Sequence, residues 1–256
     1  MSEPLLQIEN LSKRFGGIVA SDQLTLDVRE GELHAVIGPN GAGKTTLIGQ
    51  LTGEVTPNAG RIRFAGRDIT RLPTYRRSAL GLARSFQITS LFLDFTVLDN
   101  VALAVQAHAG HSFRFWRAAR GEPELREPAL AALARVGLTD RADVIARTLS
   151  HGEHRGIEIA MALASRPKML LLDEPMAGMG PEGSARMLKM LRELKKELTI
   201  LLVEHDMEAV FALADRITVL VYGRVIASGA PSDIRANRDV RDAYLGEAEQ
   251  EAAHHG

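Results

Sequence analysis

The sequence predicts an α/β fold that combines a parallel-sheet core, an antiparallel β subdomain and an inserted α-helical subdomain. Apolar runs begin at Leu33, Met169 and Thr199, and runs of four or five apolar residues are typical of strands buried on both faces of a parallel sheet. Short strand-like runs punctuated by Thr and Gly fill the first quarter of the chain, which indicates a β-rich edge. The pattern becomes helical from about residue 96 to residue 164.

The expected elements follow in chain order. Strands are expected near 5–8, 24–28, 33–37 and 62–64, then helices in VLDNVALAVQAHA, in PALAALARVGL and after residue 150, before strands return at Met169, Thr199 and Ile217. Between 181 and 197, residues Met187, Met190, Leu191 and Leu194 keep the spacing of an amphipathic helix, so these methionines are interpreted as core residues. The last ten residues, EAEQEAAHHG, are polar and are expected to fray.

Length and composition indicate one compact unit. The chain has 256 residues, of which 45% are hydrophobic, and no apolar run reaches the roughly 18 residues of a membrane span. A formal net charge of -1 without a clustered Lys/Arg stripe argues against nucleic-acid binding. The absence of Cys excludes disulfides and cysteine-ligated zinc or iron–sulfur centres. The beginning MSEPLLQIEN shows no signal peptide, so a cytosolic location is expected.

A glycine-rich loop, GPNGAGKT at 38–45, lies between the apolar run LHAVI and the helix-like KTTLIGQL. Its glycines allow conformations that aim successive backbone N–H groups at one point, and the following helix adds its positive end there. This context predicts a cradle for a nucleotide polyphosphate rather than a Gly-rich turn without a ligand. The residues expected to contact the nucleotide are Gly38, Pro39, Asn40, Gly41, Ala42, Gly43, Lys44, Thr45 and Thr46.

Three side chains of this loop have distinct expected roles. Lys44 would reach the β- and γ-phosphates as a point charge. The Thr45 hydroxyl is placed to ligate Mg²⁺, and Thr46 can hydrogen-bond further along the phosphate chain.

Two adjacent acids follow the apolar run MLLLDEP. Asp173 and Glu174 emerge at the carboxyl end of this expected strand, where α/β sheets bind ligands. Asp173 is the candidate for the Mg²⁺ shell through water, and Glu174 can polarise the water that attacks the γ-phosphate. The alternative is that these acids merely cap a helix. Because two acids at one strand end can take these different roles, hydrolysis of the nucleotide is favoured over transfer to an acceptor.

Five motifs in order give a resemblance to the ATP-binding cassettes of ABC transporters: GPNGAGKT (Walker A), Gln87 in RSFQITSLF, LSHGE at 149–153, LLLDEP, and VEHD with His205. The resemblance covers 5–246. It implies a P-loop NTPase (RecA-like) core, with nucleotide core and β subdomain at about 1–88 and 166–256 and the helical subdomain at about 89–165, all within one ATP-binding domain.

The resemblance also implies site residues. Two cassettes would meet head to tail around two ATP molecules, with Ser150 and Gly152 of one chain facing the γ-phosphate held by the other. Gln87 would touch Mg²⁺ or the attacking water, and His205 the γ-phosphate. Phe15 in SKRFGG matches the adenine-stacking aromatic, although a core or turn aromatic is the alternative. The segment MAGMGP after Glu174 matches the dimer-contact loop.

The chain departs from the common signature LSGGQ at His151 and Glu153. An acid suits the first turn of a helix, but it adds negative charge near a phosphate and weakens nucleotide engagement. The simpler interpretation of LSHGE is an N-cap at Ser150 followed by a charged first turn. His151 and His154, three residues apart, are interpreted as surface residues and not as metal ligands.

Finer features resemble the branched-chain amino acid (Liv-type) importer subfamily: SLFLDFTVLDNV, a long helical insert and the ending DAYLG. This implies membrane permease subunits as partners, a second cassette that is identical or paralogous, and an extracytoplasmic solute-binding protein acting indirectly. The location would then be peripheral, on the cytoplasmic side of the plasma membrane. The rival is a soluble, non-transport ATPase of the iron–sulfur assembly type, which binds protein scaffolds.

Two apolar segments are candidate contact surfaces. Residues 108–126 interleave Phe and Trp with Arg, which is typical either of a membrane or partner contact or of a small anchor that pins a long loop. The segment 91–95 places four apolar side chains just after Gln87, and they are expected to line a groove for a permease helix unless all four are core. These four are Leu91, Phe92, Leu93 and Phe95.

Overall fold

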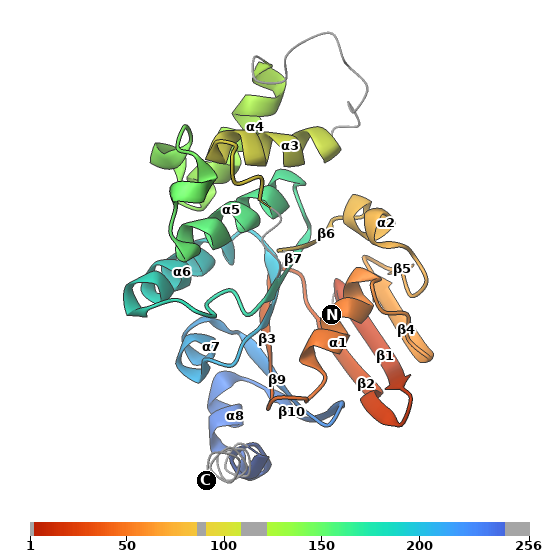
Figure 1. Ribbon diagram of the computed structural model, residues 1–256. Helices are drawn as coiled ribbons and strands as arrows, with labels where there is room; N and C mark the ends of the chain where they lie inside the picture. Colours follow the sequence, from red (N-terminus) through yellow and green to blue (C-terminus); the bar gives the residue numbers. More distant parts are fainter. Residues whose placement is uncertain (1–2, 86–90, 109–121, 244–256) are drawn as a thin grey trace. The chain divides into compact units, whose positions relative to one another are not determined.

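The computed structural model describes residues 3–85, 91–108 and 122–243 (Figure 1). The chain divides into two compact units. The first contains Met1–Arg77 and Thr199–Gly256, and the second contains Ser78–Leu198. The second unit is wider than the helical subdomain expected at about 89–165, because it also includes strands and a helix that flank the insert.

The first unit contains the predicted antiparallel β subdomain. Its sheet has the order β2-β1-β4-β5, and neighbouring strands are antiparallel. Figure 1 shows β1, β2 and β4 side by side. The buried side chains of β1 alternate over its first three residues, as expected for a half-buried strand. The strands are β1 Leu6–Phe15, β2 Ile18–Val28, β4 Ala59–Phe64 and β5 Arg67–Asp68.

The parallel strands of the first unit are almost wholly apolar. Every residue of β3 and β8 is buried, which confirms the sequence-based expectation of strands covered on both faces. Strand β3 runs parallel to β8 on one side and to β9 on the other, and β10 closes this edge antiparallel to β9. The elements are β3 Leu33–Ile37, α1 Lys44–Thr52, α2 Thr74–Ala79, β8 Thr199–Val203, α7 Met207–Leu213, β9 Arg216–Val221, β10 Arg224–Gly229 and α8 Pro231–Ala236.

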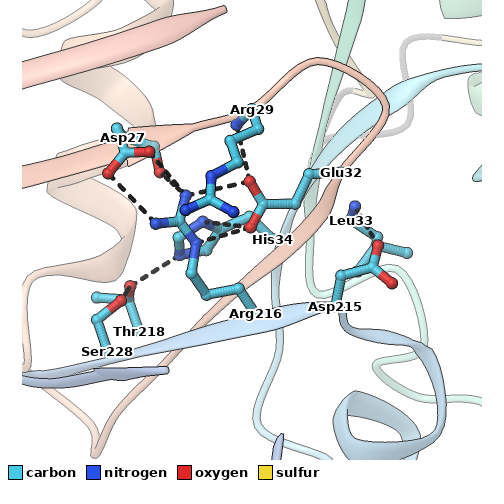
Figure 2. Close-up of polar contacts among 9 residues, drawn as sticks. All are labelled: Asp27, Arg29, Glu32, Leu33, His34, Asp215, Arg216, Thr218 and Ser228. Carbon is cyan, nitrogen blue, oxygen red and sulfur yellow. Dashed lines mark hydrogen bonds and ion pairs between the residues drawn. The ribbon is translucent and has the colours of Figure 1, made fainter. Parts of the chain in front are cut away.

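A partly buried ionic network joins β2, β3 and β9 (Figure 2). The guanidinium of Arg216 donates to Asp27 at 2.9 Å through Nη2 and to Glu32 at 2.7 Å through Nε. His34 lies beside this pair, fully buried, with Nε2 at 2.7 Å from the Thr218 hydroxyl. Arg216 therefore ties the end of β2 to the beginning of β3.

In its described residues, the second unit combines a pair of parallel strands with four α-helices. Strand β7, buried at every residue, pairs in parallel with β6. Helices α3, α4 and α5 pack against one another (Figure 1). On α6, Met187, Leu191 and Leu194 are buried and Met190 is half-buried, which confirms the predicted amphipathic helix. The elements are β6 Leu82–Arg84, α3 Val97–His108, α4 Pro123–Arg135, α5 His151–Ala164, β7 Met169–Asp173 and α6 Pro181–Leu194.

Helix length bears on membrane insertion. A span requires about 18 or more apolar residues in one helix. Within the described ranges, no helix combines the length and the hydropathy that such a span needs. The last described residue is Ala243, so the polar ending EAEQEAAHHG, which is expected to fray, lies outside the described residues.

Candidate nucleotide site

The loop between β3 and α1 has the form expected of a phosphate cradle. A Cβ atom at Gly38 would lie 2.1 Å from the carbonyl oxygen of Leu220, and one at Gly43 would lie 2.2 Å from the carbonyl oxygen of Ala20. Gly43 also has φ of 101°, in the region that favours glycine. These two positions therefore exclude side chains, because the loop passes close to the backbone of Leu220 and of Ala20.

The helix that follows this loop begins without a competing cap. Gly43 occupies the N-cap position of α1, and no side chain among the described residues caps this terminus. The first N–H groups of a helix have no partner within the helix, so they and the helix dipole favour an anion here. Thr45 is exposed and Thr46 half-buried at this end. The loop thus fits a polyphosphate, and the exposed Thr45 lies at the same end of the helix.

Lys44 is buried and turns back over the loop. Its ammonium donates to the carbonyl oxygens of Gly38 and of Pro39, the latter at 3.0 Å. These bonds hold a positive charge at the cradle and satisfy it in part through neutral carbonyl groups. A phosphate is a stronger acceptor for an ammonium than a carbonyl is, so the side chain is ready to exchange these partners for a ligand.

His205 lies at the same edge of the sheet as the cradle. Strand β8 pairs with β3 so that Val203 faces Val36, and His205 follows two residues after Val203 with its side chain exposed. The preceding Glu204 is fully buried, and its carboxylate accepts hydrogen bonds from the backbone N–H groups of His205 at 3.0 Å and Asp206 at 3.4 Å. Glu204 fixes this turn, a role that the sequence did not reveal.

Phe15 ends β1 in a hairpin whose other strand reaches the cradle. It pairs with Ile18, and Ala20, two residues further on, lies against Gly43. The ring is 49% exposed, with the Lys13 ammonium 4.9 Å from its centroid. Phe15 is therefore not a core aromatic and offers a face on which a base can stack.

In the second unit, Asp173 ends β7 and Glu174 follows it directly, at the carboxyl end of the strand as predicted. Asp173 is buried, and its Oδ2 accepts from Nη2 of Arg84 at 3.2 Å. Glu174 is half-buried and has φ of 48°, a left-handed conformation that costs roughly 1–2 kcal/mol for a residue with a side chain. Such strained residues concentrate at functional sites. Arg84 was not singled out from the sequence, because it is 89 residues from Asp173.

The signature segment forms a capping box. Ser150 is the N-cap of α5: its hydroxyl accepts from the Glu153 N–H at 3.3 Å, and its own N–H donates to Glu153 Oε2 at 2.9 Å. The N-cap predicted as the simpler interpretation is thus confirmed. Burial acts to raise the pKa of Glu153, but hydrogen bonds from Ser150 and the charge of Arg141 outweigh it and leave that pKa below its ordinary value.

The loop after Glu174 packs on this segment. The position of a Cβ at Gly178 is 3.7 Å from Nε2 of His151, and that of a Cβ at Gly152 is 3.8 Å from Sδ of Met179. Met179 thus lies beside Gly152. His151 is exposed. Among the predicted site residues, Gln87 lies outside the described residues, as do the aromatic residues of 109–121.

Comparison with known protein families shows which family this chain matches. The model described as "ABC transporter" matches residues 21–177, more than half of the chain. The chain belongs to the ABC transporter family. Cassettes of this family hydrolyse ATP to power transport, and the chain has their α/β P-loop fold. A second model, described as "Branched-chain amino acid ATP-binding cassette transporter", matches residues 224–250.

Individual relatives match almost the whole chain. The high-affinity branched-chain amino acid transport ATP-binding protein BraF of Pseudomonas aeruginosa is 40% identical, over 97% of this chain and 100% of its own. The corresponding LivG of Salmonella typhimurium is 39% identical, with the same coverage of both chains. A crystal structure of the ADP conformation of an ABC transporter cassette is 31% identical, with a TM-score of 0.85, covering 96% of this chain and 100% of that chain.

Proposed function

We propose that this protein is the ATP-hydrolysing subunit that powers uptake of branched-chain amino acids, or a related small polar solute, through separate membrane permeases. The observation that carries the proposal is the end-to-end match to BraF, a branched-chain amino acid transport protein, in a chain that also has the phosphate cradle. The iron–sulfur assembly alternative is not favoured, because the relatives are named as transport proteins.

Binding of the phosphates and of the base is assigned to residues of the first unit. The cradle 38–46 would hold the phosphates through its backbone N–H groups, with Lys44 as the positive charge, and Phe15 would stack on the base. Thr45, Gln87 and Asp173 are proposed to hold Mg²⁺. When bound, this ion neutralises charge on the phosphate oxygens. The exposed ring of Phe15 and the uncapped beginning of α1 support the assignment.

Hydrolysis is assigned to Glu174 as general base. Its carboxylate would orient the attacking water and draw its proton, His205 would contact the γ-phosphate, and Gln87 would help to position the water. The place of Glu174 directly after β7, next to the buried Asp173, supports this role.

The proposed partners are a second cassette and a pair of permease subunits. Ser150 and Gly152 would face the nucleotide held by the second cassette, which is either a copy of this chain or a paralogue. Attachment to permeases would place the chain at the cytoplasmic side of the plasma membrane. A solute-binding protein on the other side would act only through the permeases. Closure of the cassette pair on ATP and its reopening after hydrolysis would then drive transport.

Substitution of the proposed base tests this function. Glu174→Gln should keep ATP and Mg²⁺ binding but slow hydrolysis by at least roughly a hundredfold, the usual effect of losing a general base. Dimers should then accumulate with ATP. Single-turnover hydrolysis and analytical ultracentrifugation would measure the two effects.

Lys44→Ala is the matched contrast, since it removes the charge facing the phosphates and should weaken binding itself. Calorimetry should therefore detect binding of ATP to the Glu174→Gln variant but not to the Lys44→Ala variant. Near-normal turnover of Glu174→Gln would remove that residue from the role. Unchanged ATP affinity of Lys44→Ala would count against the cradle.

A further inference from the structure

The signature serine is already engaged by an acid of its own chain. The Ser150 hydroxyl donates to Glu153 Oε2 at 2.7 Å, and the Ser150 N–H donates to the same oxygen at 2.9 Å. A hydroxyl has one proton to donate. That proton can therefore serve the Glu153 carboxylate or a phosphate, but not both at once.

A side chain from another element binds the second oxygen of the Glu153 carboxylate. Arg141, in the 3₁₀ turn Thr139–Arg141 that follows α4, donates from Nε to Glu153 Oε1 at 3.1 Å. The carboxylate is thus divided, with Oε1 on the guanidinium and Oε2 on the serine. Ser150, Glu153 and Arg141 all line one cavity of about 690 Å³, together with Gly152.

We propose that Arg141 and Glu153 are positioning residues that together hold the signature serine and set its affinity for the partner cassette's γ-phosphate. Glu153 orients the serine before nucleotide arrives, and Arg141 supplies the charge that keeps this acid compatible with a phosphate. The inference rests on the proposed function, since it requires ATP to be shared between two cassettes.

Charge arithmetic decides the direction of the effect. A carboxylate without a counter-ion at the beginning of α5 would repel a polyphosphate and cancel the positive end of the helix. With Arg141 bound to Oε1, the pair is neutral in sum, and the helix end keeps its attraction for an anion. When a phosphate approaches, the serine hydroxyl can rotate to it, while Arg141 retains the carboxylate that the hydroxyl leaves.

The test is a double-mutant cycle in the Glu174→Gln background, in which ATP should be consumed only slowly. The measured quantity is the ATP-dependent association constant of the full-length cassette pair, obtained by sedimentation with whichever second cassette co-purifies, or with the chain alone. Arg141→Ala should lower it by roughly two- to fivefold per shared site, the range of a partly exposed ion pair. Glu153→Gln preserves the capping box and should leave the association as strong or stronger.

The decisive measurement is made on the chain that carries both Arg141→Ala and Glu153→Gln. Arg141→Ala should have no effect once Glu153 is Gln, and its effect should shrink in 1 M salt, where the Debye length falls to about 3 Å. If the pair of Arg141 and Glu153 had only a structural role, Arg141→Ala would instead lower the melting temperature, and salt would not restore it. Arg147→Ala is the matched control, because Arg147 is a similarly exposed arginine of the same unit that pairs with Asp94.

The outcomes separate the inference from the proposed function. If the Glu174→Gln parent forms no ATP-dependent pair, the shared nucleotide site fails and the inference falls with it. If the parent associates but Arg141→Ala behaves like Arg147→Ala, the inference is overturned while the proposed function stands. The inference is likewise overturned, with the proposed function intact, if the loss caused by Arg141→Ala persists in the Glu153→Gln chain.

Discussion

Gly43 is the residue on which the geometry of the cradle depends most closely. Its left-handed backbone and the nearby Ala20 carbonyl leave room for hydrogen only, so the loop passes β2 at van der Waals distance. That close approach fixes where α1 begins and hence where its N–H groups point. The sequence alone indicated a glycine that lets backbone N–H groups point at a ligand. The structure shows that glycine is also required because the loop lies against the backbone of Ala20.

Gly43→Ala should therefore impair both folding and ATP binding. The left-handed conformation alone costs alanine about 1 kcal/mol or more, and the overlap with Ala20 adds a backbone shift. Urea unfolding and calorimetry with ATP would measure the two losses. Gly17→Ala is the control, because a methyl group at Gly17 meets no described atom within 4 Å. Equal behaviour of the two variants would show that the loop accommodates a side chain.

Among the elements, the segment 91–95 before α3 is held by its backbone, while three of its apolar side chains are exposed. Asn100, fully buried on α3, accepts from the Phe92 N–H at 2.8 Å and donates to the Phe92 carbonyl at 3.1 Å. The rings of Phe92 and Phe95 stack with centroids 5.3 Å apart. Exposed fractions are 55% for Phe92, 39% for Leu93 and 38% for Phe95, so only Leu91 belongs to the core.

This exposed apolar cluster supports the proposed docking of a permease helix. Phe92→Ser and Leu93→Ser should abolish co-purification with the permease while leaving ATP binding and the melting temperature of the isolated chain nearly unchanged, because neither side chain is buried. Leu91→Ser is the contrasting variant. It should lower stability by about 2–5 kcal/mol, as expected for emptying a core position. If the Phe92 and Leu93 variants melt as early as the Leu91 variant, the cluster is structural.

At the scale of the whole molecule, local patterns were predictable and distant partners were not. The cradle, the strand before Asp173 and the Ser150 cap each depend on a few consecutive residues, so periodicity and turn chemistry were sufficient to find them. The pairing of Arg216 with Asp27 joins residues 189 apart. Such partners are chosen by sheet topology, which a single sequence does not specify. Burial of individual side chains, as at Phe92, likewise depends on the packed tertiary structure.

The network of Figure 2 makes the stability of the fold depend on pH. Burial lowers the pKa of His34 to about 4, the nearby charge of Arg216 lowers it further, and the carboxylates of Glu32 and Asp27 oppose the shift without reversing it. His34 is thus neutral in the folded chain, and its Nε2 is hydrogen-bonded to Thr218. For Arg216, burial acts to lower the pKa, but hydrogen bonds to Asp27 and Glu32 raise it above its ordinary value.

The free energy of unfolding should therefore fall as the pH drops from about 6.5 to about 4. In this window the unfolded chain takes up a proton on residue 34 and the folded chain does not, so protons favour the unfolded state, by about 3 kcal/mol over the whole interval. Urea unfolding at closely spaced pH values would measure the slope. His34→Gln should flatten it, whereas His108→Gln, at an exposed position, should not. An unchanged slope in His34→Gln would mean that His34 already carries a proton within the folded network.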